Sequence, residues 1–415
     1  MRQSKLFTKT IKELPKDETS FNAKALIRAG FIDKVSAGVY TFLPLGLKVH
    51  TKICNIVRKE MNVIGGQEIL MPALTPKEFW QVTDRWNNFD ALFQLAGSDK
   101  KEYALGATHE EIITPLVKKF IFSYKELPTY IYQIQTKFRN ELRAKAGLIR
   151  GREFSMKDLY SFHADKKNLD EFYELMKKVY FKIYKQCGLL NITYLTYASG
   201  GAFSKYSHEF QTLTNAGEDI IYICSNCRTA INQEIIKEQT HCPECNDKNF
   251  QKAKAVEVGN IFKLGTRFSK PFNLQYVDQN GKHKDIIMGC YGFGPSRVMA
   301  TIVETHNDDK GIIWPEEVAP FTVHLIGIRN QESGIRKKAD ELYQNLQENN
   351  IEVLYDDRDN VRPGEKFADA DLIGCPYRIV VSERTLAENS VEIKKRGKEK
   401  CEMIKIDDVI NYFKK

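Results

Sequence analysis

The chain has 415 residues, of which 42% are hydrophobic and 11% aromatic, a composition that indicates a folded protein of two or three domains. No stretch approaches the roughly 18 uncharged apolar residues that a membrane helix needs, and the N-terminal segment has no apolar signal core, so we expect a cytoplasmic protein with no membrane segment. The net charge is +8, and because residues 320–415 hold 17 Lys+Arg and 18 Asp+Glu, the first 319 residues carry +9. A basic excess favours a polyanionic partner such as ATP or RNA, although a slightly basic surface is also common in folded proteins.

The first 319 residues mix helices and strands without the regular alternation of a parallel α/β fold. Apolar residues three and four apart predict an amphipathic helix that ends at Gly65-Gly66. A second helix is expected after Thr108, its N-cap, with Glu111 as the capping-box partner. This mixture predicts an α+β core with a largely antiparallel sheet. In chain order, the predicted elements are a helix over 45–64, a strand over 68–72, a helix over 109–126, strands over 130–139 and 153–160, and a helix over 169–187.

A boundary near residues 314–320 separates this core from a C-terminal part in which strands and helices alternate. Alternation over about 95 residues is typical of a compact α/β domain with helices on both faces of a mixed sheet. The predicted elements are strands over 321–328, 351–355, 377–382 and 391–396, and helices over 334–349, 366–373 and 406–413.

The strongest chemical signal is a set of two Cys-x-x-Cys turns separated by fourteen residues. Zinc prefers four soft ligands at tetrahedral corners, and each turn offers two thiolates on one short loop. The absence of an export signal favours reduced thiols and metal binding over disulfides. His241 is a less favoured alternative ligand, and four free thiols left from a lost site are the rival interpretation. We predict a structural Zn2+ held by Cys224, Cys227, Cys242 and Cys245.

A second signal lies on the two predicted strands around residue 145. An arginine on a strand, here Arg139, can aim a bidentate fork at a phosphate or a carboxylate. Glu141, two residues on, points to the same face and can accept from an exocyclic amine, and Phe154 on the returning strand can stack on a base. A charged hairpin on a solvated surface is the simpler alternative.

A glycine-rich turn over 289–294 precedes a predicted helix that begins near Pro295. The turn lacks the dinucleotide-binding spacing, since no glycine stands three residues after Gly294. Arg297 falls in the first helical turn, where the guanidinium and the helix dipole both favour an anion. A glycine turn that leads into a core helix is the alternative.

Two further groups of polar residues are candidates for ligand binding. The hydroxyl of Thr108 and the carboxylate of Glu110 could together receive an ammonium group, although helix capping alone is a common use of such residues. His163 and Gln211 are polar residues in apolar company, where a histidine is more often a satisfied core residue than a functional one.

Taken together, these segments resemble the prolyl-tRNA synthetases of the bacterial type, a subgroup of the class II aminoacyl-tRNA synthetases. The resemblance covers nearly the whole chain, and several of its motifs are specific to prolyl enzymes. The segments that carry it are 36–46 with the following helix and strand to Pro72, 106–111, 132–141, 152–154, 156–163, 289–297, 362–369 and 372–374.

The resemblance implies ATP-dependent activation of L-proline to prolyl-adenylate and its transfer to tRNA(Pro). It implies Mg2+ with ATP and a homodimer formed through the first class motif. The catalytic pair would be Arg139 and Arg297. Proline binding is implied for Thr108, Glu110, Arg139, His163 and Cys290, and ATP binding for Arg139, Glu141, Phe154, Gln211 and Arg297.

The resemblance also implies a domain division: a class II catalytic domain over 1–319 and an α/β anticodon-binding domain over 320–415. The large editing domain usual in bacterial prolyl enzymes is absent, and residues 219–254 form a short zinc-ribbon-like insertion in its place. We therefore expect no editing of Ala-tRNA(Pro) in cis, and reliance on a separate deacylase or tolerance of the error. A threonyl or seryl enzyme, or a catalytically silent relative, is the competing interpretation.

Overall fold

The computed structural model describes residues 1–13, 18–144, 146–200, 206–328 and 334–414. The chain divides into two compact units. The larger comprises Ser36–Tyr40 and Ile53–Thr301, and the smaller comprises Met1–Val35, Thr41–Lys52 and Ile302–Lys415. Across the described ranges no helix is long and apolar enough to cross a membrane.

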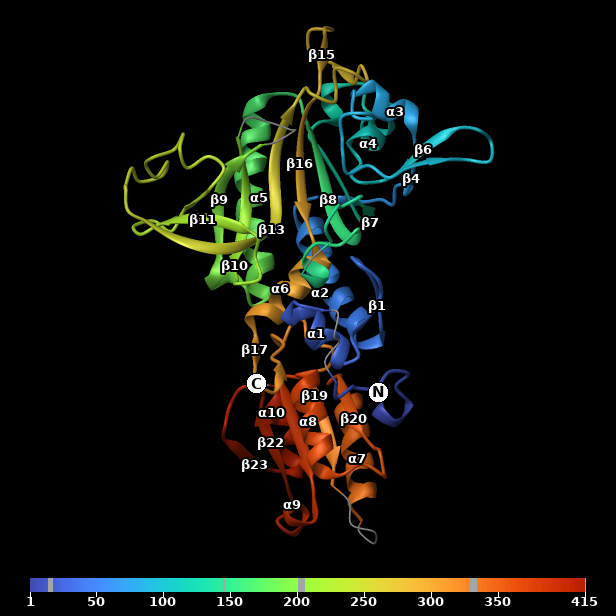
Figure 1. Ribbon diagram of the computed structural model, residues 1–415, viewed down its shortest axis with the longest axis vertical. Helices are drawn as coiled ribbons and strands as arrows, with labels where there is room; N and C mark the ends of the chain where they lie inside the picture. The colour runs from blue at the N-terminus through green and yellow to red at the C-terminus, as the bar shows by residue number, and fades with distance from the viewer. Residues whose placement is uncertain (14–17, 145, 201–205, 329–333, 415) are drawn as a thin grey trace. The chain divides into compact units, whose positions relative to one another are not determined.

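A nine-stranded sheet forms the centre of the larger unit (Figure 1). All its neighbouring strands pair antiparallel except β3 with β7 and β12 with β9, which confirms the expected α+β class. Strands β7 and β8 form a hairpin in which Thr129 faces Phe162 and Phe138 faces Glu153. In pairing order the strands are β10 (Tyr206–Leu213), β9 (Thr193–Ser199), β12 (Ala230–Asn232), β11 (Asp219–Cys224), β13 (Phe250–Gly265), β16 (Ile287–Phe293), β8 (Glu153–His163), β7 (Thr129–Phe138) and β3 (Gln67–Glu68).

The two faces of this sheet are covered by different helices. Helix α5 packs on β8, β13 and β16 and starts at the N-cap Asp165, whose carboxylate accepts from the backbone N–H of Asn168 at 2.8 Å. On the other face, α4 contributes Ile112, Ile113 and Val117 to a core shared with apolar residues of β8 and β16. The helices are α2 (Pro44–Val63), α3 (Lys77–Val82), α4 (Glu110–Val117), α5 (Lys166–Gln186) and α6 (Pro295–Thr305).

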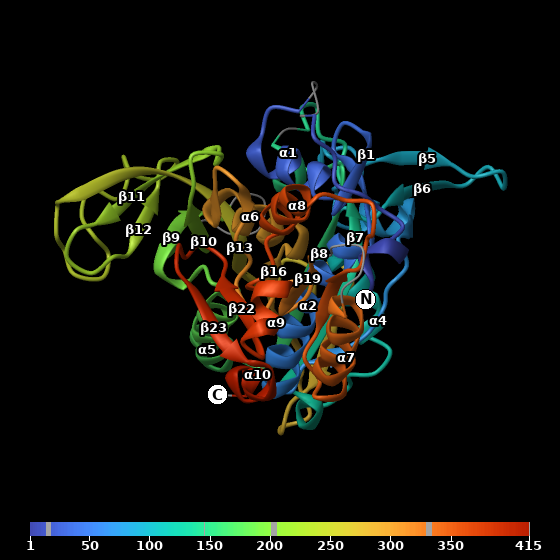
Figure 2. The same ribbon diagram turned by 90° about the horizontal axis from the view of Figure 1, so that it is seen from below.

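The residues of the predicted zinc-ribbon-like insertion extend the sheet. Strand β11 pairs with the first half of β13, β10 pairs with the second half, and β12 joins β11 to β9 (Figure 2). Each of the five strands from β9 to β13 thus pairs with two of the other four. Together the five strands enclose a small apolar core. The remaining strands of the unit are β4 (Leu74–Pro76), β5 (Gln94–Ala96), β6 (Glu102–Leu105), β14 (Gln275–Val277) and β15 (His283–Asp285).

Two predicted elements of this unit are shorter than expected. The helix predicted over 109–126 ends at Val117, because Ser123 and Glu126 form a capping box of their own around a 3-10 turn, with the Glu126 carboxylate accepting from two backbone N–H groups. The predicted Thr108–Glu111 capping box is wrong, since His109 is the N-cap and Thr108 donates to Glu110 instead. The strand over 68–72 has only two residues, because the Gln133 side chain takes the N–H of Met71.

The smaller unit contains a mixed five-stranded sheet, ordered β20-β19-β21-β22-β23. The first three strands are parallel and the last two antiparallel, as the strand–helix alternation predicts. Helix α8 begins at Pro363, earlier than predicted, while α9 and β23 were not predicted. The elements are α1 (Phe21–Arg28), β1 (Ile32–Ser36), β2 (Val39–Phe42), β17 (Asn307–Asp308), β18 (Gly311–Ile312), β19 (Val323–Gly327), α7 (Ile335–Glu348), β20 (Val353–Asp356), α8 (Pro363–Ile373), β21 (Tyr377–Val381), α9 (Glu383–Ala387), β22 (Ser390–Lys395), β23 (Cys401–Lys405) and α10 (Val409–Phe413).

Candidate active site

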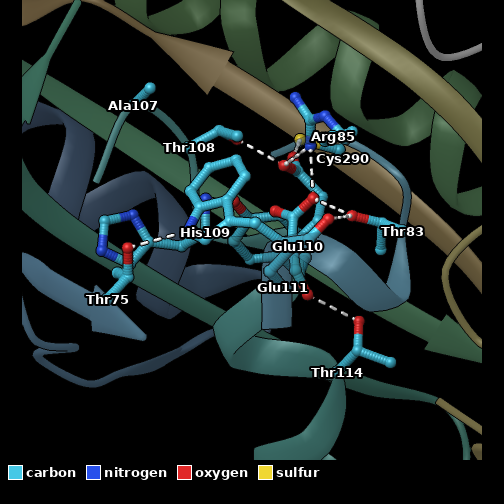
Figure 3. Close-up of polar contacts among 12 residues, drawn as sticks. Thr75, Thr83, Arg85, Ala107, Thr108, His109, Glu110, Glu111, Thr114 and Cys290 are labelled. Atoms are coloured by element: carbon cyan, nitrogen blue, oxygen red, sulfur yellow. Dashed lines mark hydrogen bonds and ion pairs between the residues drawn. The ribbon is translucent and has the colours of Figure 1, made fainter. Parts of the chain in front are cut away.

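The N-terminus of helix α4 gathers a buried polar cluster (Figure 3). The Thr108 hydroxyl donates to the Glu110 carboxylate at 2.5 Å, and the Cys290 thiol from β16 lies 3.5 Å from the other oxygen of that carboxylate. Arg85 donates to Glu111 at 2.8 Å and approaches Glu110 at 3.4 Å. All five side chains are buried, so the two carboxylates meet their partners out of water.

A second buried network supports this cluster from strands β7 and β8. Lys137 forms an ion pair with Asp158 at 2.8 Å and contacts Nδ1 of His109 at 2.8 Å, while Nε2 of His109 lies 3.0 Å from the carbonyl of Pro72. Burial, with the neighbouring Lys137 charge, lowers the pKa of His109 to about 4. The imidazole is therefore neutral near pH 7 and adds no charge to the network. The charges of the Lys137–Asp158 ion pair then compensate each other.

Arg139, at the end of β7, lies beside a second arginine. Its guanidinium stands 5.3 Å from the ring centre of Phe154 and donates to the carbonyl of Ala107 at 3.4 Å. Burial and then the positive charge of Arg297 lower the pKa of Arg139. Arg297 is held by the carbonyls of Ile149 at 2.9 Å and Glu257 at 2.7 Å. Two guanidinium groups that repel each other in a partly buried site favour an anion between them.

Acidic side chains lie on the strands opposite these arginines. Asn260 donates to Glu257 at 2.7 Å, and Gln211 donates to Glu209 at 2.9 Å and to Asp219 at 2.9 Å. Burial and then the charge of Glu257 raise the pKa of Glu209 to about 8. Glu209 therefore holds a proton near pH 7, and a cation bound beside it would displace that proton.

Two adjoining cavities, of about 710 and 40 Å³, lie over this face of the sheet. Thr108, Arg85 and Phe262 line the larger cavity, and Phe154 and Arg297 line the smaller one. The residues that line both are Arg139, Glu141, Glu257 and Asn260. The geometry thus offers an apolar and acidic compartment for a small cation, a ring-lined compartment with two arginines for an anion, and Arg139 at the boundary between them.

The structure brings most of the predicted site residues together and places one of them, His163, elsewhere. The Glu141 carboxylate is engaged by Arg150 at 2.9 Å, and Gln211 is fully buried with its amide N–H groups turned to carboxylates. His163 does not join the cluster around Glu110. Strand alternation puts it on the α5 face, where Nδ1 contacts Asn168 at 2.6 Å and the ring lies 5.7 Å from that of Phe172.

The four cysteines of the predicted zinc site lie together. Their sulfur atoms are all within 4.8 Å of one another, with Cys224 and Cys245 at 3.5 Å and Cys227 and Cys242 at 3.3 Å. The two loops have the same backbone: the residue after each second cysteine, Arg228 or Asn246, has φ of +65° or +61° and donates its N–H to the carbonyl of the first cysteine. The alternative ligand His241 lies outside this set, and its ring is hydrogen-bonded to the Thr240 hydroxyl.

Sequence reasoning missed several cavity residues. Arg85 stands between two tryptophans in the segment 80–86, and that aromatic density was the available signal. Glu257 and Asn260 could not be recognised as neighbours from the sequence, for a physical reason. A bulge between β10 and β13 puts one extra residue, Val258, into β13, so two residues three apart share a face that strict alternation would have separated.

Comparisons with known proteins place this arrangement in a family. Residues 93–306 match the tRNA synthetase class II core domain (G, H, P, S and T), and residues 322–415 match the anticodon binding domain. A proline–tRNA ligase of Wolbachia sp. subsp. Brugia malayi (strain TRS) is 38% identical over 426 residues, covering 100% of this chain and 99% of that protein. The chain belongs to the proline–tRNA ligase family. A member from Ehrlichia chaffeensis (strain Arkansas) is also 38% identical, with 100% of both chains covered.

Alignment lengths distinguish two sizes of relative. The proline–tRNA ligase of Bacillus cereus (strain Q1) is 33% identical over 564 aligned positions, 149 more than the 415 residues here, with 99% of that protein covered. The short chain thus fits the predicted lack of a large editing domain. Among solved structures, a prolyl-tRNA synthetase of Giardia lamblia in complex with prolyl-adenylate has the same fold, with a TM-score of 0.79 at 22% identity, covering 94% of this chain and 75% of that one.

Proposed function

We propose that the protein activates L-proline with ATP to give prolyl-adenylate and transfers the prolyl group to tRNA(Pro). One observation carries the proposal: Arg139 lies between a compartment built to receive an ammonium group and one built to receive a nucleotide. In the first step of such a reaction the amino-acid carboxylate attacks the α-phosphorus of ATP, the bond from that phosphorus to the bridging oxygen breaks, and pyrophosphate leaves. Both reacting groups are anionic, so a shared guanidinium can hold them together.

The proposed roles follow the geometry. Thr108, which lines the larger cavity, and Glu110, to which it donates, accept the proline ammonium group, with Cys290 against the Glu110 carboxylate, and Arg139 holds the proline carboxylate and the α-phosphate. Phe154 stacks on adenine, and Arg297 holds the γ-phosphate. Because the substrate carboxylate is itself the nucleophile, no protein base is required. Catalysis is then positioning plus stabilisation of the charge that develops on the phosphate oxygens.

Glu141 and Gln211 take supporting roles in this proposal. Glu141, at the boundary of the two cavities, accepts from the adenine amine, with Arg150 holding its carboxylate in place. Gln211 orients Glu209 and has an amide oxygen that is buried without a hydrogen-bond partner. Mg2+ prefers carboxylate and amide oxygens, so Glu209 and Glu257 fit a magnesium ion that accompanies ATP and neutralises its phosphates.

The four cysteines fit a structural zinc ion. Tetrahedral Zn–S bonds of about 2.3 Å separate sulfur atoms by about 3.8 Å, and the observed sulfur positions approach that arrangement on two loops of equal geometry. Zinc would tie the loop between β12 and β13 to the end of β11. The same loop supplies Glu234, Ile235 and Glu238 to the wall of the larger cavity, so the insertion contributes directly to the substrate site.

For tRNA, we propose that residues 320–415 form the anticodon-binding domain and residues 1–319 the catalytic domain, divided at the predicted boundary. The basic run 394–398 offers Lys394 and Lys398, which line a cavity of about 240 Å³, whereas Arg396 is committed to Asp308 at 2.6 Å. A homodimer formed through the first class motif, and a separate deacylase for Ala-tRNA(Pro), complete the proposal.

The test is aminoacylation of a tRNA(Pro) transcript with labelled proline, followed as acid-precipitable product. Product that depends on ATP, proline and the intact 3′ end supports the proposal. Adenylate formation without transfer would restrict the protein to the first step, and the absence of both from folded protein would refute the proposal.

A further inference from the structure

The charges around Glu110 do not balance within the protein. Two buried carboxylates, Glu110 and Glu111, share one guanidinium, that of Arg85, whose side chain is only 7% exposed. The second oxygen of Glu111 is buried without a hydrogen-bond partner. Burial raises the pKa of Glu111, and the charge of Arg85 opposes that shift. When Arg85 holds both carboxylates in the ionised form, the trio carries a net charge of −1. An uncompensated buried charge is costly unless a ligand of opposite sign completes it.

Among the described residues, Arg85 is the one group that forms an ion pair with Glu110 or Glu111, although the charge of Glu110 opposes the lowering of the pKa values of Lys137 and Arg139 by burial. Burial raises the pKa values of the Cys290 thiol and the Tyr160 phenol well above their usual ranges, so both are neutral. His109 is neutral, as its lowered pKa requires. Lys137 and Asp158 form a pair that has no net charge whichever partner holds the proton. Arg139 lines the same cavity as Thr108; burial and then Arg297 lower its pKa, and Glu110 is the last of three carboxylates that oppose this shift.

Arg85 is held in place independently of the carboxylates. Its guanidinium carbon lies 4.6 Å from the ring centre of Phe89, 5.5 Å from that of Trp80 and 5.7 Å from that of Phe268. Cation–π contacts of this kind stabilise a buried guanidinium. Burial alone would lower the pKa of Arg85, but Glu111 and Glu110 raise it, so the charge on this residue is permanent. Thr83 donates to the same oxygen of Glu111 as Arg85 does, at 2.9 Å.

We propose that Arg85 is a positioning and specificity-determining residue. It neutralises one of the two carboxylates and leaves a single negative charge at Glu110, which selects an amino acid whose amino group is cationic. This inference rests on the proposed activation of proline. A zwitterion then finds a carboxylate for its amino group at Glu110 and a guanidinium for its own carboxylate at Arg139. Neutral ring acids of the same shape lack the first interaction.

The test compares four variants in proline-dependent ATP–pyrophosphate exchange between pH 6 and 8.5: Arg85→Met, Arg85→Lys, Glu111→Gln and the double variant Arg85→Met/Glu111→Gln. Arg58→Met is the matched control, because Arg58 forms a bidentate pair with Glu68 on an exposed surface. The second readout is inhibition by tetrahydrofuran-2-carboxylate, in which a ring oxygen replaces the NH2+ group of proline.

In Arg85→Met, two adjacent carboxylates lose their counter-ion and hold a proton between them, which proline must displace. The KM for proline therefore rises roughly tenfold or more, rises further as the pH falls, and leaves the KM for ATP within about twofold. The double variant restores the net charge of −1 and recovers most of the loss. Glu111→Gln alone makes the trio neutral and weakens the preference for proline over tetrahydrofuran-2-carboxylate, whereas Arg85→Lys retains most of that preference.

The inference is overturned if the double variant has a KM for proline as high as that of Arg85→Met and if that KM does not change with pH. Arg85 would then be a structural residue. If Arg85→Met does not fold, the other two single variants decide. Equal preference for proline in Glu111→Gln and in the wild type overturns the inference. Absence of exchange in the wild-type protein would instead refute the proposed function, so the two failures are distinguishable.

Discussion

Two arginines on one hairpin should respond to truncation in opposite ways. Among the described residues, the Arg139 side chain makes one long hydrogen bond, to the carbonyl of Ala107 at 3.4 Å, and Arg297 repels it. Arg152, which directly precedes β8, donates to the carbonyls of Glu141 at 3.0 Å and Ala37 at 3.1 Å. Arg139 therefore contributes little to the fold and much to substrate binding, and Arg152 the reverse.

The magnitudes follow from these contacts. A bidentate guanidinium makes two charge-assisted hydrogen bonds to its anion, each worth about 1.5–3 kcal/mol, so Arg139→Ala costs about 3–6 kcal/mol of transition-state stabilisation. That corresponds to a loss of roughly 10²–10⁴ in kcat/KM for exchange. The free energy of unfolding should change by less than about 0.5 kcal/mol. Arg152→Ala should lose about 1–2 kcal/mol, a fall in Tm of about 2–8 °C, with less than about a tenfold kinetic effect.

The assay is proline-dependent ATP–pyrophosphate exchange, with thermal unfolding of the same preparations followed by circular dichroism. Arg139→Lys serves as the conservative comparison, since it keeps the charge but loses the planar fork. The reasoning fails if Arg139→Ala keeps exchange within about tenfold of wild type. It also fails if that variant loses as much stability as Arg152→Ala, because Arg139 would then be a structural residue.

Three further predictions concern a lysine, the cysteines and alanine. Burial lowers the pKa of Lys157 to about 7, so between pH 7 and its unfolded value of 10.5 the unfolded chain binds more protons and stability rises with pH. Lys157→Met should remove that slope, a few kcal/mol over the window, and Tm curves that stay parallel from pH 7 to 10 would contradict this. The protein should release one equivalent of zinc when its thiols are blocked, and Cys227→Ser should release it more readily than Cys401→Ser, the exposed control; equal release would exclude the cysteine site. Because two missing carbons are worth about 1.6 kcal/mol, alanine should be activated only about 15-fold less efficiently than proline by that term, and Ala-tRNA(Pro) should persist with the purified protein; prompt hydrolysis would refute the expected lack of editing.

The parts of the fold that follow from local pattern could be predicted from the sequence. The helix over 45–64 is observed as α2 (Pro44–Val63), and Gly65 after it has φ of +82°. The two strands around residue 145 and the helix that starts at Pro295 are also observed. In each case periodicity, a glycine or a proline determines the element through the residues themselves.

What could not be predicted depends on contacts between distant segments. The helix after Thr108 ends at Val117 because a capping box forms at Ser123, and Thr108 turns to Glu110 rather than capping. His163 lies on the α5 face by strand alternation, but which face of the sheet α5 covers depends on tertiary packing that no local pattern reveals. Arg85 enters the site only through tertiary packing of its aromatic neighbours.

The central claim is that this site joins proline to ATP, and the most direct measurement is ATP–pyrophosphate exchange with proline, alanine and threonine in parallel. We expect strong exchange with proline, a weaker signal with alanine and none with threonine. Folded, zinc-loaded protein that gives no exchange with any of the three amino acids would contradict the account.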